Sequence, residues 1–284
     1  MQNAIEIRGL SKSFPGFQLG PLDLTVPAGA MYGLVGPNGA GKTTTLDLIF
    51  GLGLREAGDI RVFGLDHKKD EVAMKRIAAY VSPHTSYAPW KYVGRAIQFI
   101  RGFYPEWDQD YCDDLLRRFR IDKEEKIATL SLGNAIKLGV VLALARRPKV
   151  LIMDEPTMGL DAISKRELFA ELLALMGDEE HTVLISSHNL TDLERFTDHI
   201  GIINNGKLLL EGATDHLLEK HRQVSFTLAG EPPAGARLVK RDGDEVSALT
   251  DSADEYVEAL AGCGAIGVTV QPVTLEELFV GLVD

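Results

Sequence analysis

The chain has 284 residues, 45% hydrophobic and 25% charged, a globular composition that allows one large α/β domain with a small appendage. Its formal net charge of -11 argues against a nonspecific nucleic-acid binder, which needs a basic face, so we expect no nucleic-acid partner. The two cysteines, Cys112 and Cys263, are far apart and predict free thiols in a cytosolic protein, and neither a signal peptide nor a membrane-spanning stretch is visible.

The N-terminal part predicts an antiparallel lobe. Residues 4–10 and 22–26 alternate apolar and polar side chains, as half-buried strands do. Residues 12–16 between them predict a turn that carries an exposed aromatic residue, Phe14. Phe14 could stack on an adenine ring, since stacking needs only a π-face, or it could pack over the edge of the lobe.

A nucleotide phosphate loop follows. The stretch GPNGAGKTT fits G-x-x-x-x-G-K-[ST], after a buried strand at 31–35 and before a helix at 44–50. Its glycines let backbone N–H groups curl around phosphate oxygens at the positive end of the helix dipole. Lys42 would reach the β- and γ-phosphates, and the Thr43 hydroxyl would ligate Mg²⁺. The alternative is an ordinary glycine-rich turn between a strand and a helix. The predicted nucleotide-binding residues of this loop are Gly36, Asn38, Gly39, Gly41, Lys42, Thr43 and Thr44.

The middle of the chain predicts helices inserted into the core. A strand is expected at 58–64, a helix at 72–79 and a strand at 79–81, followed by the breaker Ser82-Pro83-His84. Apolar residues then fall at helical spacing from Trp90 to Arg120, with a break at Tyr104-Pro105, and a further helix is expected at 137–147. We therefore expect a helical subdomain at about 85–145. Its aromatic residues are core by default, although Phe103, Tyr104 and Trp107 could form a docking surface.

A second signal for nucleotide chemistry comes at the end of a buried strand. Residues 150–153 are continuously apolar, as in parallel sheets, and lead directly into two acids. Ligands bind at this end of the strands in open α/β sheets. Asp154 would hold Mg²⁺ through water, and Glu155 would activate the attacking water. The alternative is a pair of acids that merely cap a strand.

The remaining elements complete an α/β pattern. A helix is expected at 164–176, strands at 182–186 and 199–203, a short helix at 191–196 and an Asn-Gly turn at 204–207.

Residues 222–284 predict a small α/β appendage. It contains a strand at 223–228, a hairpin around Asp242-Gly243 and two helices opened by capping boxes at 252–255 and 274–277. We find no catalytic constellation in it.

Five motifs in a fixed order extend the interpretation to a family. They are GPNGAGKTT, LSLGN at 130–134, LIMDEP at 151–156, GLD at 159–161 and SSH at 186–188. Together they resemble the ATP-binding cassette (ABC) ATPases, and the resemblance covers roughly residues 4–220. It implies an α/β fold of the phosphate-loop NTPase class, with a mainly parallel sheet, an antiparallel lobe, a helical subdomain and a C-terminal appendage. The implied domains are 1–221 and 222–284, and the implied cofactors are ATP and Mg²⁺.

The resemblance also assigns further site residues. LSLGN matches the family's signature motif, usually LSGGQ, so Ser131 and Gly133 would cap the γ-phosphate of ATP held by the opposite subunit. Asp161 would belong to the loop that joins the two sites. His188 matches the switch histidine at the γ-phosphate, and Phe14 the aromatic that stacks on adenine.

Two departures from the family pattern are visible. Leu132 and Asn134 differ from the commonest signature motif. Where the family usually has a glutamine that touches Mg²⁺ and the attacking water, this chain has Pro83 and then His84. Either His84 replaces the glutamine or the coupling to the membrane partner differs.

The function implied by the resemblance is that of the ATPase subunit of a bacterial transporter. It would work as a dimer with a second nucleotide-binding subunit, bound to a polytopic membrane subunit on the inner face of the cell membrane. The segment 268–279 resembles the tail of subunits that serve separate membrane partners, which favours an exporter (ABC-2 exporter-like). The alternatives are a soluble ABC-family ATPase of translation or DNA repair and, less compatible with LSLGN, a phosphate-loop kinase or GTPase.

Overall fold

The computed structural model describes residues 2–177 and 181–283. The chain divides into two compact units, Met1–His188 with Ile203–Leu208 and Asn189–Ile202 with Leu209–Asp284. Within the described ranges, no helix is both long enough and apolar enough to cross a membrane.

An antiparallel sheet forms the predicted N-terminal lobe. Its strands follow the order β2-β1-β4-β5 and are β1 (Asn3–Phe14), β2 (Phe17–Pro27), β4 (Ala57–Val62) and β5 (Leu65–Asp66). The first two strands are longer than predicted, because the expected turn at 12–16 shrinks to Pro15-Gly16. Gly16 has φ +81, and a proline followed by a glycine with positive φ suits a tight type II turn. Phe14 therefore ends a strand, opposite Phe17.

The predicted parallel sheet lies at the centre of the first unit. Four strands run side by side in the order β3 (Met31–Val35), β8 (Thr182–Ser187), β7 (Val150–Asp154) and β6 (Ala78–Val81). All three pairings are parallel, and the register places Asp154 opposite Ser186, and Val35 opposite Ser187. The carboxyl ends of these strands thus meet at one edge of the sheet.

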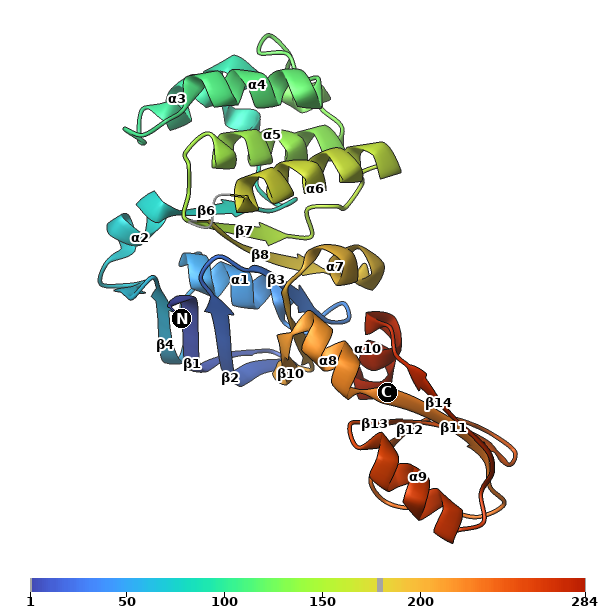
Figure 1. The fold of residues 1–284 in the computed structure, drawn as a ribbon. Helices are drawn as coiled ribbons and strands as arrows, with labels where there is room; N and C mark the ends of the chain where they lie inside the picture. Colours follow the sequence, from blue (N-terminus) through green and yellow to red (C-terminus); the bar gives the residue numbers. More distant parts are fainter. Residues whose placement is uncertain (1, 178–180, 284) are drawn as a thin grey trace. The chain divides into compact units, whose positions relative to one another are not determined.

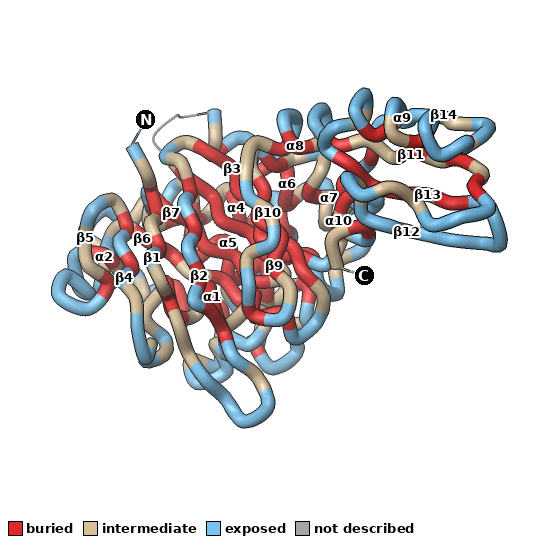
Figure 2. The backbone as a smooth tube through the Cα atoms, turned by 90° about the horizontal axis from the view of Figure 1, so that it is seen from below, coloured by how far each residue is buried: buried red, intermediate tan, exposed pale blue. Residues whose placement is uncertain are grey.

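Helices cover both faces of this parallel sheet (Figure 1). Helix α1 (Lys42–Phe50) lies between the parallel sheet and the antiparallel lobe and packs against β7 and β4, while α2 (Glu71–Ile77) packs beside β5 and β6. The opposite face is covered by α5 (Leu132–Leu144) against β6 and by α6 (Ala162–Met176) against β8. Buried stretches run along β3, β7 and α5 (Figure 2).

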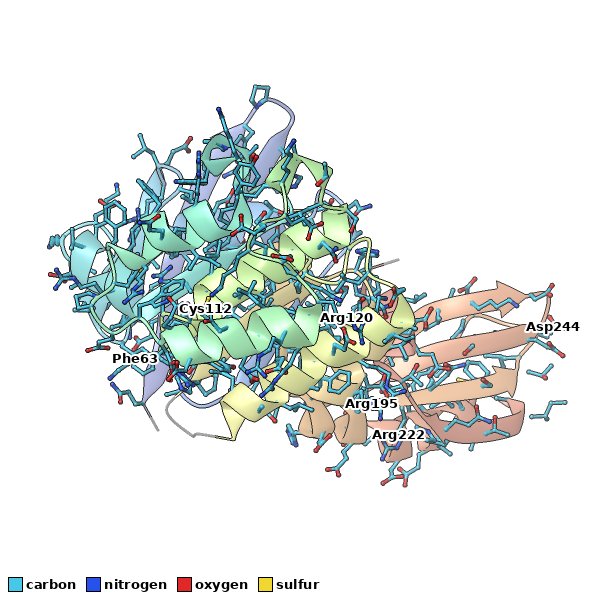
Figure 3. All side chains as sticks on the ribbon, turned by 90° about the horizontal axis from the view of Figure 1, so that it is seen from above. Phe63, Cys112, Arg120, Arg195, Arg222 and Asp244 are labelled. Atoms are coloured by element: carbon cyan, nitrogen blue, oxygen red, sulfur yellow. The ribbon has the colours of Figure 1, made fainter. Side chains whose placement is uncertain are left out.

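The helical part of the first unit consists of short helices around α5. They are η1 (Ala88–Trp90), α3 (Val93–Arg101), α4 (Gln109–Phe119) and η2 (Ile127–Thr129). Figure 3 labels Cys112, which is buried in the first turn of α4, and Arg120, which caps the end of that helix. Cys112 and Cys263 are both free, as predicted. The prediction for α5 was wrong at both ends, since the helix runs from Leu132 to Leu144 rather than from 137 to 147.

The turn predicted at 204–207 is present. The strands β9 (His199–Asn204) and β10 (Lys207–Ala213) are separated by Asn205 and Gly206, which have φ values of 47 and 75. Two consecutive positive φ values are the signature of a type I′ hairpin turn, the geometry that Asn-Gly favours.

The second unit contains its own sheet. Its strands follow the order β12-β13-β11-β14, all antiparallel, and the predicted hairpin joins β12 to β13. Figure 3 labels Asp244 in the turn of that hairpin. Tyr256 and Leu260 of helix α9 pack on Val224 and Phe226 in a separate small core. The remaining bounds are α7 (Leu190–Phe196), α8 (Thr214–Lys220), β11 (Arg222–Thr227), β12 (Arg237–Asp242), β13 (Glu245–Thr250), α9 (Ala253–Gly262), β14 (Ile266–Pro272) and α10 (Leu275–Val283).

One of the two predicted capping boxes forms. At the start of α10 the Thr274 N–H donates to Glu277 Oε2 at 2.8 Å, and the Glu277 N–H donates to Thr274 Oγ1 at 3.2 Å. At the start of α9 the prediction was wrong in its chemistry. Ser252 precedes the helix but makes no capping hydrogen bond, and its hydroxyl donates to Asp251 Oδ1.

Candidate functional site in the phosphate-loop cleft

The phosphate loop connects β3 to α1 as predicted, and two of its glycines have no room for a side chain. A Cβ on Gly36 would lie 2.3 Å from the backbone oxygen of Ile203. Gly41 has φ +108, and a Cβ there would lie 2.9 Å from Leu19 Cδ1. Both positions therefore require glycine. Gly36 requires it because the Ile203 backbone approaches closely, and Gly41 requires it because of its left-handed conformation and the nearby Leu19 side chain. The chain thus folds the loop tightly onto its surroundings.

Lys42 begins helix α1 and its side chain turns back into the loop. Its Nζ donates to the carbonyl oxygen of Gly36 at 2.7 Å and lies 3.5 Å from Glu155 Oε1. The side chain is only 6% exposed. A buried ammonium held by carbonyl and carboxylate oxygens is a cation aimed at the place where phosphate oxygens would bind.

Thr43 and Asp154 are hydrogen-bonded to each other. Thr43 Oγ1 donates to the Asp154 carboxylate, with distances of 3.1 and 2.9 Å to its two oxygens. Ser186 Oγ donates to Asp154 Oδ1 at 2.6 Å from the neighbouring strand β8. Ser186 holds this carboxylate in place, and no sequence motif had singled it out for that role.

Glu155 follows directly after β7 in an unusual backbone conformation. Its φ is +44, a left-handed value that is rare outside glycine and is concentrated at functional sites. Its N–H donates to Ser186 Oγ at 3.0 Å, which steadies the turn. The carboxylate extends between two basic side chains, Lys42 and His188, and His188 Nδ1 lies 2.7 Å from Glu155 Oε2.

The cleft that Lys42, Thr43, Asp154 and Glu155 line has a volume of about 550 Å³, in the usual range for small-molecule sites, and within the described part of the chain its lining does not include the predicted residues Gly36 and His188. Phe14 lines it and is 40% exposed, so its ring is available for stacking. Phe17, across the turn, lines the cleft too, with its ring centroid 6.3 Å from that of Phe14. Phe17 and Met158 were not predicted as site residues. The Pro15-Gly16 turn could have indicated Phe17, because it pairs Phe17 with Phe14 across the hairpin. The lining consists of Phe14, Phe17, Asn38, Gly39, Gly41, Lys42, Thr43, Thr44, Pro83, His84, Asp154, Glu155 and Met158.

The structure places the sequence departure inside this cleft, since Pro83 and His84 both line it. A local hydrogen bond stabilises the segment 82–84, since the His84 N–H donates to Ser82 Oγ at 3.2 Å. Behind it, Tyr80 donates to Asp47 Oδ1 at 2.7 Å, and burial raises the pKa of Asp47 above its usual value, helped by the nearby charge of Asp154. His84 thus lies where it could meet a nucleotide bound in the cleft.

The signature residues form a second cluster. Among the described residues, the cleft lining includes neither Ser131 and Gly133 nor Asp161. Ser131 caps α5, accepting from the Asn134 N–H at 3.2 Å, and Asp161 caps α6, accepting from the Ser164 N–H at 2.7 Å. The hydrogen bond from Ser164 is the main reason that the pKa of Asp161 lies below its usual value.

The residues of the cleft fit a nucleoside triphosphate with magnesium. The loop is packed tightly enough that two of its positions require glycine, Lys42 offers a buried cation, and Thr43 and Asp154 offer the oxygen ligands that Mg²⁺ prefers. These groups are of the kinds that a phosphoryl-transfer site uses, and the Glu155 carboxylate lies beside Lys42.

Comparison with known proteins agrees with this geometry. Residues 19–158 match a family model described as ABC transporter. The chain is 35% identical over 218 residues to the bacitracin transport ATP-binding protein BcrA of Bacillus licheniformis, which covers 75% of this chain and 71% of that protein. It belongs to the ABC transporter ATP-binding family. The predicted resemblance, fold class and role as a transporter's ATP-binding subunit are thereby confirmed, and the soluble alternative is not favoured.

Two further similarities extend over more of the molecule. The Nod factor export ATP-binding protein I of Rhizobium sp. (strain N33) is 28% identical over 296 residues, covering 98% of this chain and 96% of that protein. A solved structure of an ATP binding subunit of an ABC transporter superposes on this protein with a TM-score of 0.70 at 27% identity. The match covers 76% of this chain and 92% of the chain in that structure. The family likeness to the export protein therefore includes the C-terminal appendage.

Proposed function

We propose that this chain binds and hydrolyses ATP to power a membrane transporter of the exporter type. One observation carries the proposal: Lys42, Thr43, Asp154 and Glu155 converge on one cleft at the carboxyl edge of a parallel sheet. They are the groups that phosphoryl transfer to water requires. The relatives named for bacitracin transport and Nod factor export support a transport role and favour export.

Each side chain has a part in the proposed reaction. Lys42 and the loop N–H groups bind and orient the β- and γ-phosphates, and Phe14 stacks on the adenine ring. Thr43 and Asp154 would hold a Mg²⁺ ion, which when bound neutralises charge on the phosphates. Glu155 accepts the proton of the attacking water, and His188, at hydrogen-bond distance from Glu155, contacts the γ-phosphate.

We propose that two nucleotide-binding subunits complete each other's sites. Ser131 and Asp161 are exposed and do not line the cleft of their own chain, so they are available to a second subunit, and Gly133 is buried beside them against Leu160 and Gly159. An isologous dimer would bring this surface over the partner's cleft twice, once for each site. ATP would then lie between the subunits, and its hydrolysis would release them.

We propose a polytopic membrane subunit as the second partner, which would hold this chain at the inner face of the cell membrane. Phe99 and Phe103 of the helical subdomain are 50% and 64% exposed, and the Phe99 ring centroid lies 5.2 Å from that of Trp90 and 5.1 Å from that of Phe103. Exposed apolar patches of this kind mark interaction surfaces. The segment from His84 to Trp90 joins this surface to the cleft, so a partner bound there would act close to the nucleotide.

We propose a division into two domains, each with its own hydrophobic core. A nucleotide-binding domain would extend over residues 1–221, with its helical subdomain at about 85–145, and an accessory domain over residues 222–284. The separate core between α9 and β11 supports the accessory domain.

Affinity purification of the tagged chain from its native membranes tests the transport proposal. We expect a polytopic protein in stoichiometric amount in the detergent-solubilised fraction, together with ATPase activity. The phenylalanine patch provides the control: Phe99→Ala with Phe103→Ala should lose the membrane protein and keep ATP binding. Recovery of the wild-type chain only with ribosomes or DNA would instead support the soluble alternative.

A further inference from the structure

Lys137, in the middle of helix α5, is a buried charged side chain outside the nucleotide cleft. Its side chain is 5% exposed. Its Nζ donates to Ser164 Oγ at 2.8 Å and lies 3.2 Å from Glu167 Oε2, and it sits 5.6 Å from the centroid of the Phe119 ring. An ammonium group withdrawn from water needs such partners, because an unpaired buried charge is strongly unfavourable. Both polar partners of Lys137 lie on α6.

The link through Ser164 reaches the end of the loop that precedes α6. Ser164 receives the Lys137 hydrogen bond on its hydroxyl and donates its own N–H to Asp161 Oδ1 at 2.7 Å. A continuous chain of hydrogen bonds therefore runs from the interior of α5 to Asp161. Glu167, the other partner of Lys137, is held in turn by Arg120 at 3.1 Å, from the end of α4 that Figure 3 labels.

A second contact joins the same two segments near their ends. A Cβ on Gly133 would lie 2.8 Å from Leu160 Cδ2 and 3.1 Å from the carbonyl oxygen of Gly159. The Leu132 side chain lies over Gly159, where a Cβ would meet its Cδ2 at 3.2 Å. The departure from the usual signature motif at Leu132 thus adds a packing contact to the loop before Asp161.

We propose that Lys137 is a positioning residue that fixes the signature segment, Ser131 to Gly133, against the loop that ends at Asp161. The two segments then meet the partner subunit's nucleotide as one rigid surface. The inference rests on the proposed function, in which both segments act across a dimer. Apolar side chains of similar volume would hold two helices together about as well as a buried ion pair. Hydrogen bonds from Lys137 to Ser164 and Glu167 are directional, so they also fix how far α5 is shifted along its axis relative to α6.

The test uses the full chain with Glu155→Gln, so that bound ATP is retained, and compares Lys137→Met with Lys137→Arg. Three quantities are measured for each protein: ATP binding by the monomer, the ATP-dependent monomer–dimer equilibrium by sedimentation, and the temperature of thermal unfolding. Lys137→Met should bind ATP as the parent does, while its dimer dissociation constant rises by about tenfold or more, the scale of coupling within one hydrogen-bond network. Lys137→Arg, which keeps the charge and the donors, should dimerise close to the parent.

Leu138→Ala is the matched control, because Leu138 is the next residue on α5 and is fully buried but apolar. It should lower the unfolding temperature and leave dimerisation at a lower temperature intact. Ser164→Ala gives a second variant that removes only the acceptor between Lys137 and Asp161, and it too should weaken the dimer. Normal dimerisation of both Lys137→Met and Ser164→Ala, or equal weakening by Leu138→Ala, would overturn the inference. A Glu155→Gln parent that remains monomeric with ATP would instead contradict the proposed function itself.

Discussion

His188 and Glu155 are in direct contact: the imidazole Nδ1 lies 2.7 Å from the Glu155 carboxylate. The two residues come from the ends of adjacent parallel strands, β8 and β7, and the sheet register brings them together. Glu155 also faces Lys42 at 3.5 Å, so its carboxylate lies between His188 and Lys42. The contact adds a role toward the proposed base to the γ-phosphate contact that we propose for His188.

His188→Ala should therefore slow ATP hydrolysis by about 10²-fold, the lower range for groups that support general base catalysis, and leave ATP binding close to normal. A single-turnover assay with a parallel binding titration separates these two effects. His181 is the control, since it precedes the same strand at its other end and bonds Pro148 O at 2.7 Å. Equal loss of activity in His181→Ala would attribute the effect to the strand rather than to the His188–Glu155 contact.

His84 should carry out the role of the glutamine that the family usually has near this position. His84→Ala is expected to slow hydrolysis about tenfold or more, as for the loss of one charge-assisted hydrogen bond of about 1.5–3 kcal/mol. Pro83→Gln should add nothing while His84 is present. Steady-state hydrolysis over a range of Mg²⁺ concentrations measures both. Faster hydrolysis in Pro83→Gln, with a silent His84→Ala, would mean that the contact is missing rather than replaced.

Ser131→Asp should prevent the ATP-dependent dimer of a Glu155→Gln chain without harming the fold. Aspartate caps a helix as well as serine does, so α5 keeps its start, but a carboxylate now faces the partner's γ-phosphate. Ser131→Asn is an equally good cap without the charge and should dimerise far better. Sizing with ATP distinguishes the two variants. If Ser131→Asp dimerises as well as Ser131→Asn, the signature serine does not meet the partner's phosphate.

The ordered motifs allowed most of the site to be predicted, because each of them stands at a strand end or a helix start. The strand before Asp154 and the strand before His188 were both visible as apolar runs, and their parallel pairing places the two ends together. The contact between His188 and Glu155 is a consequence of that register. Sequence spacing alone carries no information on the register between β7 and β8, whose paired residues, such as Asp154 and Ser186, are 32 positions apart.

Other features depended on tertiary contacts that no local pattern records. The prediction for α5 started five residues late, because Gly133 and Asn134 are poor helix formers and the cap by Ser131 was overlooked. The strands of the first hairpin were predicted too short. Residues 11–14 show no clear alternation of apolar and polar side chains, and they are part of a strand because they pair with β2. At α9, the serine and the acid have the spacing of a capping box, but Ser252 has φ -135 and ψ 61, and its side chain accepts no hydrogen bond from the helix.

The central claim is that this chain hydrolyses ATP with Glu155 as the base, and one experiment tests it directly. ATP binding and single-turnover hydrolysis are measured in parallel for the wild type, Lys42→Ala and Glu155→Gln. Lys42→Ala should lose tight binding, since it loses the main cation of the loop and a charged hydrogen bond of about 1.5–3 kcal/mol. Glu155→Gln should bind ATP with Mg²⁺ like the wild type and hydrolyse it about 10²–10⁴-fold more slowly. Wild-type turnover by Glu155→Gln with normal ATP binding would contradict the account.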